Sequence, residues 1–124
     1  MFAKEGDNLI LTGRRKDRLN SLKNEFESCH NVKVHILCFD IRIKSEVEAA
    51  IGSLPPGWQH IDILVNNAGI LSNNKATTTT PEEWQRVMSV NLDGAFYLSR
   101  AVLPALPTVP AERPDLFHAL ETVR

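Results

Sequence analysis

Two carboxamides and two very small residues directly follow an apolar run in the middle of the chain. The run is IDILV at 61–65, and Asn66, Asn67, Ala68 and Gly69 come after it. Asparagine side chains both donate and accept hydrogen bonds, so they suit a neighbouring strand or a ribose hydroxyl. Alanine and glycine let a flat ligand lie against the backbone. An ordinary turn after a strand is the competing interpretation.

A basic cluster follows another short apolar run. The run NLILT at 8–12 is closed by Gly13, and Arg14 and Arg15 begin the stretch RRKDR. The solvated start of a helix is the simplest explanation for such a stretch. Nucleic-acid binding is a poorer one, because the chain has a net charge of only −1.

Asn91 interrupts an apolar stripe in the stretch 81–104. The stripe places the following residues on one predicted helix face: Trp84, Val87, Met88, Leu92, Ala95, Phe96, Ser99 and Leu103. A buried carboxamide without partners costs about 1–3 kcal/mol, so we expect Asn91 to hold a neighbouring backbone segment. Gly94, one turn later, indicates the close approach of another backbone or a ligand.

A metal site is not expected. The candidate ligands are Cys29, His30, His35 and Cys38. Because His35 and Cys38 are three residues apart on a predicted strand, their side chains point to opposite faces. Ordinary packing is the better interpretation, and His60 and His118 add no further pattern.

Strands alternate with helices along the chain, which predicts βαβ units and a parallel sheet. The predicted strands cover 8–12, 33–39 and 61–65, and the predicted helices cover 16–28, 45–54 and 81–104. Ser45 with Glu48, and Thr80 with Glu83, have the spacing of capping boxes. Pro81 suits the first position of the last helix.

Composition limits the class of protein. The chain has 124 residues, 43% hydrophobic and 23% charged, which predicts one domain at most. No apolar run approaches the roughly 20 residues that a membrane span needs, and no signal peptide is recognised at the start. Two cysteines do not form a disulfide framework, so we expect a cytoplasmic protein without a membrane or nucleic-acid partner.

The motifs together resemble a known family. IDILVNNAGI, SVNLDGAFYLSRAVLP, NLILTGRRKDRL and the FDI at 39–41 are similar, in order, to the middle of the classical short-chain dehydrogenases/reductases. The resemblance covers about residues 2–106. It implies an α/β fold with a Rossmann-like parallel sheet that binds a dinucleotide.

The resemblance also implies residue roles. Arg14 and Arg15 match the turn that reads the adenosine ribose, where arginine favours the 2′-phosphate of NADP and an acidic residue favours NAD. Asp40 and Ile41 match the pair that borders the adenine. The segment 66–69 (Asn66, Asn67, Ala68, Gly69) matches the part that runs along the ribose.

Asn91 matches the family's fourth catalytic residue, which shapes a helix kink and helps to hold a water in the proton relay. Other parts of the family's machinery are missing. The strand with the Gly-rich loop Thr-Gly-x-x-x-Gly-x-Gly is absent, and so is the catalytic Tyr-x-x-x-Lys, since the only tyrosine is Tyr97 and Ala101 follows four residues later. The family's catalytic serine is absent as well. We therefore expect an incomplete Rossmann-like sheet of three βα units.

The last 18 residues depart from the family pattern. We divide the chain into a partial NAD(P)-binding domain at 1–106 and a Pro-rich tail at 107–124. Pro107, Pro110 and Pro114 argue against a central strand in this tail. The strands at 8–12 and 61–65 would then border a gap, with unpaired edges and low stability in isolation.

These expectations lead to a ranked set of functions. The first is a truncated NADP-dependent oxidoreductase of an alcohol or carbonyl substrate, inactive by itself. The second is a non-catalytic module that associates with itself or with full-length homologous subunits through helix 81–104. The third is a fragment without function. The sequence does not identify the substrate.

Overall fold

A four-stranded parallel sheet forms the centre of the computed structural model, which describes residues 1–107 and 118–123. The strands are β1 (Asn8–Gly13), β2 (Val34–Cys38), β3 (Ile63–Val65) and β4 (His118–Thr122), and their order across the sheet is β2-β1-β4-β3. The α/β class and the parallel sheet agree with the prediction, and the three predicted strands are present.

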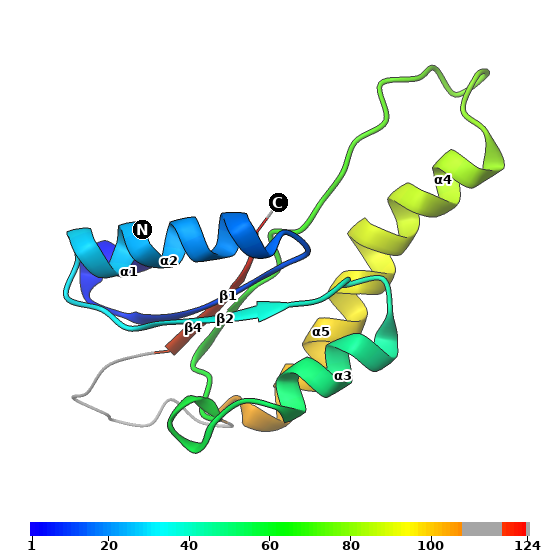
Figure 1. The fold of residues 1–124 in the computed structure, drawn as a ribbon. Coiled ribbons are helices and arrows are strands. Elements are labelled where there is room, and N and C mark those ends of the chain that lie inside the picture. The colour runs from blue at the N-terminus through cyan, green and yellow to red at the C-terminus, as the bar shows by residue number, and fades with distance from the viewer. Residues whose placement is uncertain (108–117, 124) are drawn as a thin grey trace.

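Helices cover both faces of this sheet. Figure 1 shows α1 and α2 on one face and α3 and α5 on the other, with α4 extending away from the sheet. The helices are α1 (Phe2–Glu5), α2 (Lys16–Cys29), α3 (Lys44–Gly52), α4 (Pro81–Met88) and α5 (Gly94–Val102), with a π-helical segment (Ser89–Asp93) and 3₁₀ turns at Pro56–Trp58 and Leu103–Ala105. In the part of the chain that the structure describes, no helix has the length and apolar character needed to cross a bilayer.

Strand residues are apolar on both sides, as in a buried parallel sheet. Leu9 and Leu11 of β1 point into the core beneath α1 and α2, while Ile10 points into the core against α3 and α5. Ala119 and Leu120 of β4 divide between the same two cores, and both are fully buried. Alternate residues of the strands therefore face two separate hydrophobic cores, one on each side of the sheet.

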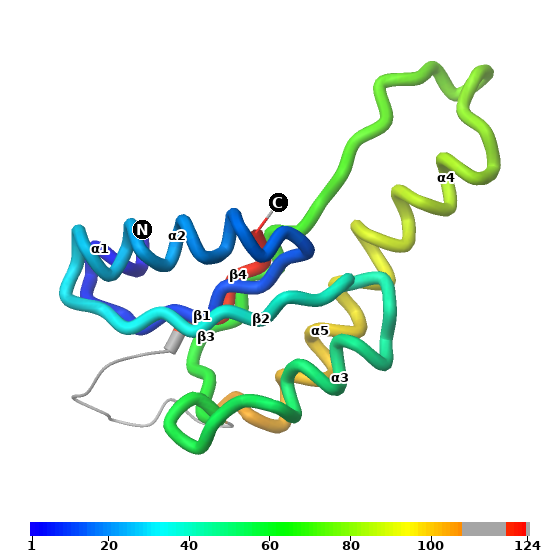
Figure 2. The backbone as a smooth tube through the Cα atoms, viewed as in Figure 1, coloured from blue at the N-terminus to red at the C-terminus, as the bar shows by residue number. Residues whose placement is uncertain are grey.

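The prediction that β1 and β3 border a gap is wrong, because β4 lies between them. The strand β4 pairs in parallel with β1 from Asn8↔His118 to Thr12↔Thr122 and with β3 from Ile63↔Ala119 to Val65↔Glu121. In Figure 2 it lies between these two strands. A central strand fits the tail because it begins only after the last proline. Of the three prolines that argued against it, Pro110 and Pro114 lie outside the described residues.

The predicted capping box at Thr80 and Glu83 has its N-cap hydrogen bond. The Thr80 hydroxyl accepts the backbone N–H of Glu83 at 3.2 Å, which confirms Thr80 as the N-cap of α4. The Glu83 carboxylate accepts hydrogen bonds from Ser72 and Asn74, and these bonds lower the pKa of Glu83. The backbone of Thr80 makes a smaller contribution in the same direction, as the reciprocal half of a capping box would.

The capping box at Ser45 was predicted wrongly. The helix α3 begins one residue earlier, at Lys44, and its N-cap Ile43 makes no side-chain cap. Glu48 forms an ion pair with Lys44 at 3.0 Å. The four-residue spacing of these two charges therefore stabilises the surface of the helix and not its N-terminus.

The last helical stretch turns a different face to the core from the one predicted. Val90, Gly94, Leu98 and Val102 are buried, whereas Trp84, Leu92, Phe96 and Leu103 are 60%, 58%, 58% and 62% exposed. Apolar residues occur on all sides of this helical stretch, so their periodicity could not identify which face is buried. The π-helical segment also changes the angular register between α4 and α5.

Candidate functional site

A pocket of about 220 Å³ opens at the carboxyl ends of all four strands. In parallel α/β sheets ligands bind at this edge. The pocket brings together six of the residues predicted from the sequence, which are Arg14, Arg15, Asp40, Ile41, Ala68 and Gly69.

The side chains of Asn66 and Asn67 are not part of this pocket lining. The Asn66 amide donates to the Ser99 hydroxyl at 3.0 Å, which joins the end of β3 to α5. Asn67 contributes its backbone N–H, which donates to Thr122 Oγ1 at 2.7 Å. Asn66 therefore contacts a helix rather than a neighbouring strand, and only the backbone of Asn67 contacts β4; contact with a ribose hydroxyl stays a prediction.

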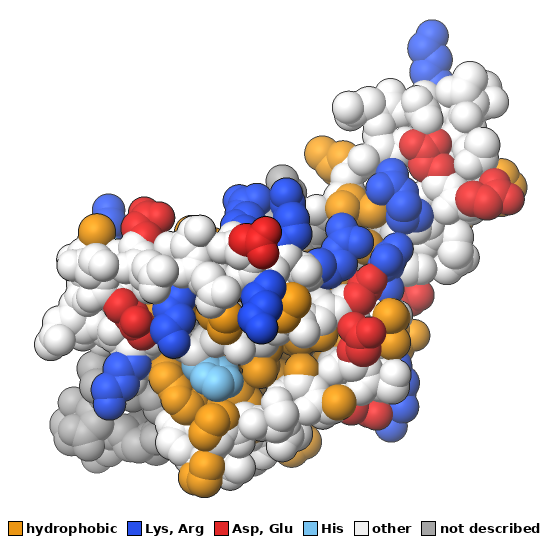
Figure 3. Space-filling model, in the orientation of Figure 1, with side chains coloured by type: hydrophobic (Ala, Val, Ile, Leu, Met, Phe, Trp, Pro, Cys, Tyr) orange, Lys and Arg blue, Asp and Glu red, His pale blue; other side chains and the backbone are white. Residues whose placement is uncertain are grey.

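Positive charge is concentrated on one side of the pocket. Arg14, Arg15 and Arg18 line it, and Arg15 is the N-cap of α2, where the helix dipole adds further positive potential. Figure 3 shows Lys and Arg side chains gathered between α2 and α4. Sequence reasoning missed Arg18, although its spacing of three from Arg15 on a helix was a usable signal.

Asp40 is the one acidic residue among the side chains that line the pocket, and it is already paired. Arg42 donates to both of its carboxylate oxygens, with the shortest contact from Nη2 at 2.6 Å. These hydrogen bonds lower the pKa of Asp40, which keeps the carboxylate ionised. Because Arg42 neutralises this charge, Asp40 does not cancel the three arginines of the pocket.

Asn91 joins the π-helical segment to the loop after β3. Its Oδ1 accepts the N–H of Ile70, and its Nδ2 donates to the carbonyl of the same residue, both at 2.8 Å. The expected tie to a neighbouring backbone is therefore present, but the side chain is exposed rather than buried. Ile70 lines the pocket, so Asn91 holds one part of its wall.

Gly94 permits a close contact beneath the same wall. A Cβ at this position would lie 2.9 Å from Cγ2 of Ile41. A close approach to Gly94 therefore exists, but it comes from the side chain of Ile41 and not from the backbone or ligand that was predicted.

Thr122 at the end of β4 and Val123, which follows the strand, complete the lining. Sequence reasoning missed both, because it expected no strand in this region. Once the strand is known, a threonine at its carboxyl end, beside the ends of β1 and β3, is a usable signal. Tyr97, by contrast, packs against the core of α3 and α5, with its ring centroid 6.1 Å from that of Phe96. Within residues 1–107 and 118–123, no group of three or more side chains is arranged to hold a metal ion.

A positively charged pocket at the carboxyl edge of a parallel sheet is typical of dinucleotide-binding folds. The family model described as short chain dehydrogenase matches residues 1–112, so the chain belongs to this family. The NADP-dependent 3-hydroxy acid dehydrogenase YdfG of Escherichia coli (strain K12) is 39% identical over 106 residues, covering 85% of this chain and 41% of that protein. Sulfoacetaldehyde reductase of Chromohalobacter salexigens has the same identity and coverage.

Solved structures are also similar to this chain. Serine dehydrogenase from Escherichia coli matches with a TM-score of 0.73 and 36% identity, covering 97% of this chain and 51% of that chain. The closed form of serine dehydrogenase complexed with NADP+ matches with a TM-score of 0.72 and 37% identity, covering 97% of this chain and 45% of that chain. The chain thus spans about half or less of the length of these relatives.

Proposed function

We propose that this chain binds NADP(H) by its adenosine half, at the pocket on the carboxyl edge of the sheet. The observation that carries the proposal is the group of three arginines, Arg14, Arg15 and Arg18, at a pocket whose single carboxylate is neutralised by Arg42. A 2′-phosphate is attracted to such a group, while the described residues that line the pocket include no unpaired acid suited to the free ribose of NAD.

The remaining lining residues suit the rest of the adenosine. Ile41 supplies an apolar surface for the adenine beside Asp40, and the backbone at Ala68 and Gly69 lets the ribose lie close. A volume of about 220 Å³ is below the roughly 300–1,000 Å³ usual for drug-sized ligands, which favours half of a dinucleotide over the whole.

The family reaction that we assign to the whole protein is oxidoreduction of an alcohol or carbonyl group, for which NADP supplies or accepts the hydride. The 124-residue chain does not perform it alone. Tyr-x-x-x-Lys is absent, and proton transfer needs a group at the reacting oxygen. In the whole protein, we assign Asn91 to the proton relay, where it would help to hold a water. The exposed free thiols of Cys29 and Cys38 are compatible with the reducing cytoplasm expected from the sequence.

Calorimetric titration tests the proposal with three ligands: NADPH, NADH and adenosine 2′,5′-bisphosphate. We expect saturable binding of NADPH and of the bisphosphate, and at least about tenfold weaker binding of NADH, since each lost charged hydrogen bond costs about 1.5–3 kcal/mol. The double variant Arg14→Ala/Arg15→Ala should lose the preference for NADPH, and Arg100→Ala on the exposed side of α5 is the matched control. Equal affinity for NADPH and NADH in the folded chain would refute the 2′-phosphate assignment.

The exposed apolar side chains along the helical stretch 81–105 favour a second candidate function. Trp84, Leu92, Phe96 and Leu103 are all more than half exposed and lie on the predicted helix face. A second copy of the chain, or a full-length homologous subunit, would cover them. Sedimentation should show a dimer that Leu92→Glu and Phe96→Glu disrupt, whereas a monomer at all concentrations would exclude self-association.

A further inference from the structure

We infer that Thr122, on the C-terminal strand β4, positions the Asn67–Ala68 backbone, so that the nucleotide pocket of this chain is complete only with β4 in place. The inference rests on the proposed NADP site. It assigns a role in that site to a strand that was not predicted from the sequence.

The hydroxyl of Thr122 collects two backbone donors from the turn after β3. Its Oγ1 accepts the N–H of Asn67 at 2.7 Å and the N–H of Ala68 at 2.6 Å. The same hydroxyl lies 3.5 Å from the carbonyl of Val65, to which it donates. One side chain therefore satisfies the backbone where it leaves the ladder of β3.

The burial of Thr122 makes its hydrogen bonds important for the conformation of the turn. The Thr122 side chain is buried, so water is not at hand to replace a lost hydrogen bond. Val65 pairs with Glu121 at the end of the β3–β4 ladder, and the next residues must turn away from the sheet. The turn carries Ala68 and Gly69, which form the pocket wall for the ribose.

The end of β4 also fixes the opposite wall. The N–H of Val123 donates to the carbonyl of Thr12 at 2.6 Å, and the Val123 carbonyl lies 3.3 Å from where a Cβ of Gly13 would be. Arg14 and Arg15 follow directly on this wall. The strand β4 therefore sets the spacing between the arginines and the Ala68–Gly69 backbone.

Three variants separate positioning from stability. Thr122→Val keeps the shape and removes the oxygen, and Thr122→Ser keeps the oxygen. Leu120→Val trims a buried apolar residue on β4 whose side chain gives the turn no hydrogen bond, and so it controls for loss of stability. The readouts are NADPH affinity by calorimetry and the exchange rates of the Asn67 and Ala68 amides by NMR.

With Thr122→Val we expect affinity to fall about tenfold and the two amides to exchange on the order of tenfold faster. The Ala68 N–H loses the buried oxygen that accepts it, and the Asn67 N–H keeps only the Val65 carbonyl, at 3.1 Å. Thr122→Ser should stay within about twofold of the wild type, and Leu120→Val should leave both readouts close to it. Unchanged exchange and affinity in Thr122→Val would overturn the inference, as would equal losses in Thr122→Val and Leu120→Val.

Failure of the proposed function gives a different result. A folded wild-type chain that does not bind NADPH would refute the NADP site. In that case faster exchange at Asn67 and Ala68 in Thr122→Val would still support the positioning role, and unchanged exchange would refute it.

Discussion

At the scale of residues, Asn91 shows how one side chain links two elements. Its carboxamide offers a donor and an acceptor in the same plane, and Ile70 presents the matching pair from its backbone. The side chain thus makes with this loop the pair of hydrogen bonds that a neighbouring strand would make with a strand. Its position in the π-helical segment turns the carboxamide toward that loop.

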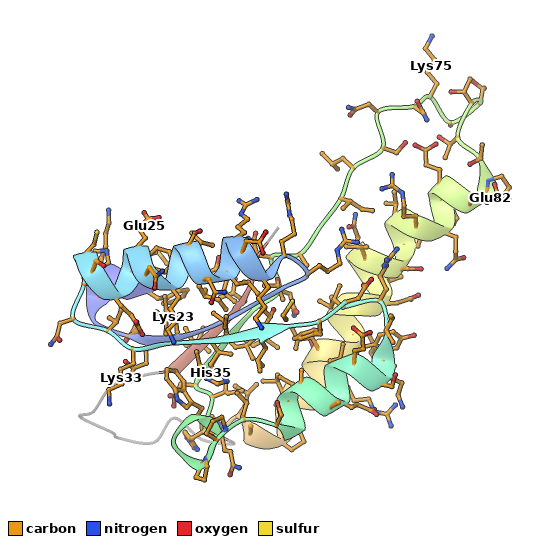
Figure 4. The ribbon with its side chains drawn as sticks, in the orientation of Figure 1. Lys23, Glu25, Lys33, His35, Lys75 and Glu82 are labelled. Atoms are coloured by element: carbon orange, nitrogen blue, oxygen red, sulfur yellow. The ribbon has the colours of Figure 1, made fainter. Side chains whose placement is uncertain are left out.

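His35 is the residue whose protonation should affect folding. It stands on β2 with its ring 5.4 Å from that of Trp58, and burial lowers its pKa, with a smaller contribution from the charge of Lys23. Figure 4 shows Lys23 reaching from α2 toward the strand that carries His35. The folded state therefore disfavours the charged imidazole.

The expected result is a loss of stability on acidification. Because the pKa of His35 is lower in the folded state, the unfolded state binds more protons below about pH 6.5, the ordinary histidine value. The contribution of His35 is complete above that pH and declines as the pH falls toward the folded pKa. His35→Phe keeps an aromatic ring beside Trp58 and should flatten the dependence. Urea unfolding between pH 7.5 and 5 measures it, and identical slopes in both proteins would contradict the prediction.

At the scale of elements, the contact between α5 and the loop after β2 depends on Gly94. Alanine normally favours a helix over glycine by about 1 kcal/mol. Here its Cβ would meet Ile41 at 2.9 and 3.0 Å, at atoms close to the backbone of that residue. We expect Gly94→Ala to lower the free energy of unfolding by about 1–3 kcal/mol, as measured by urea titration.

Two further variants test this cause. Gly52→Ala, in α3, meets nothing within 4 Å and should be neutral or slightly stabilising. Ile41→Ala removes the two clashing carbons, so Gly94→Ala should cost less in its presence than in the wild type. Additive effects of the two substitutions would argue against the contact.

At the scale of the whole molecule, β4 joins the two halves of the sheet. Ala119 and Leu120 are fully buried in separate cores, and the strand pairs with both β1 and β3. A chain ending at Leu106 would expose both of those strands and lose residues from each core. We expect it to melt without a cooperative near-UV transition.

The full chain is the control for this melt. The low stability expected from the sequence remains a prediction, and the same experiment measures it. A cooperative transition at an unchanged temperature in the shortened chain would show that β4 does not hold the sheet together.

Local patterns were enough to predict most elements and much of the pocket. The apolar runs located β1, β2 and β3 to within two residues, and polar or small residues after them marked the edge where the pocket lies. Six of the predicted residues meet there, because parallel strands bring their carboxyl ends to one edge whatever their order in the chain.

The sequence by itself determined the class of sheet, the positions of three strands and the arginines beside the pocket. Only the tertiary structure decided that β4 is central, which face of α5 is buried and that Thr122 completes the pocket. The reason is that a five-residue strand such as His118–Thr122 carries little pattern of its own. Its place depends on the unpaired backbone of β1 and β3, which are distant in sequence and adjacent only after folding.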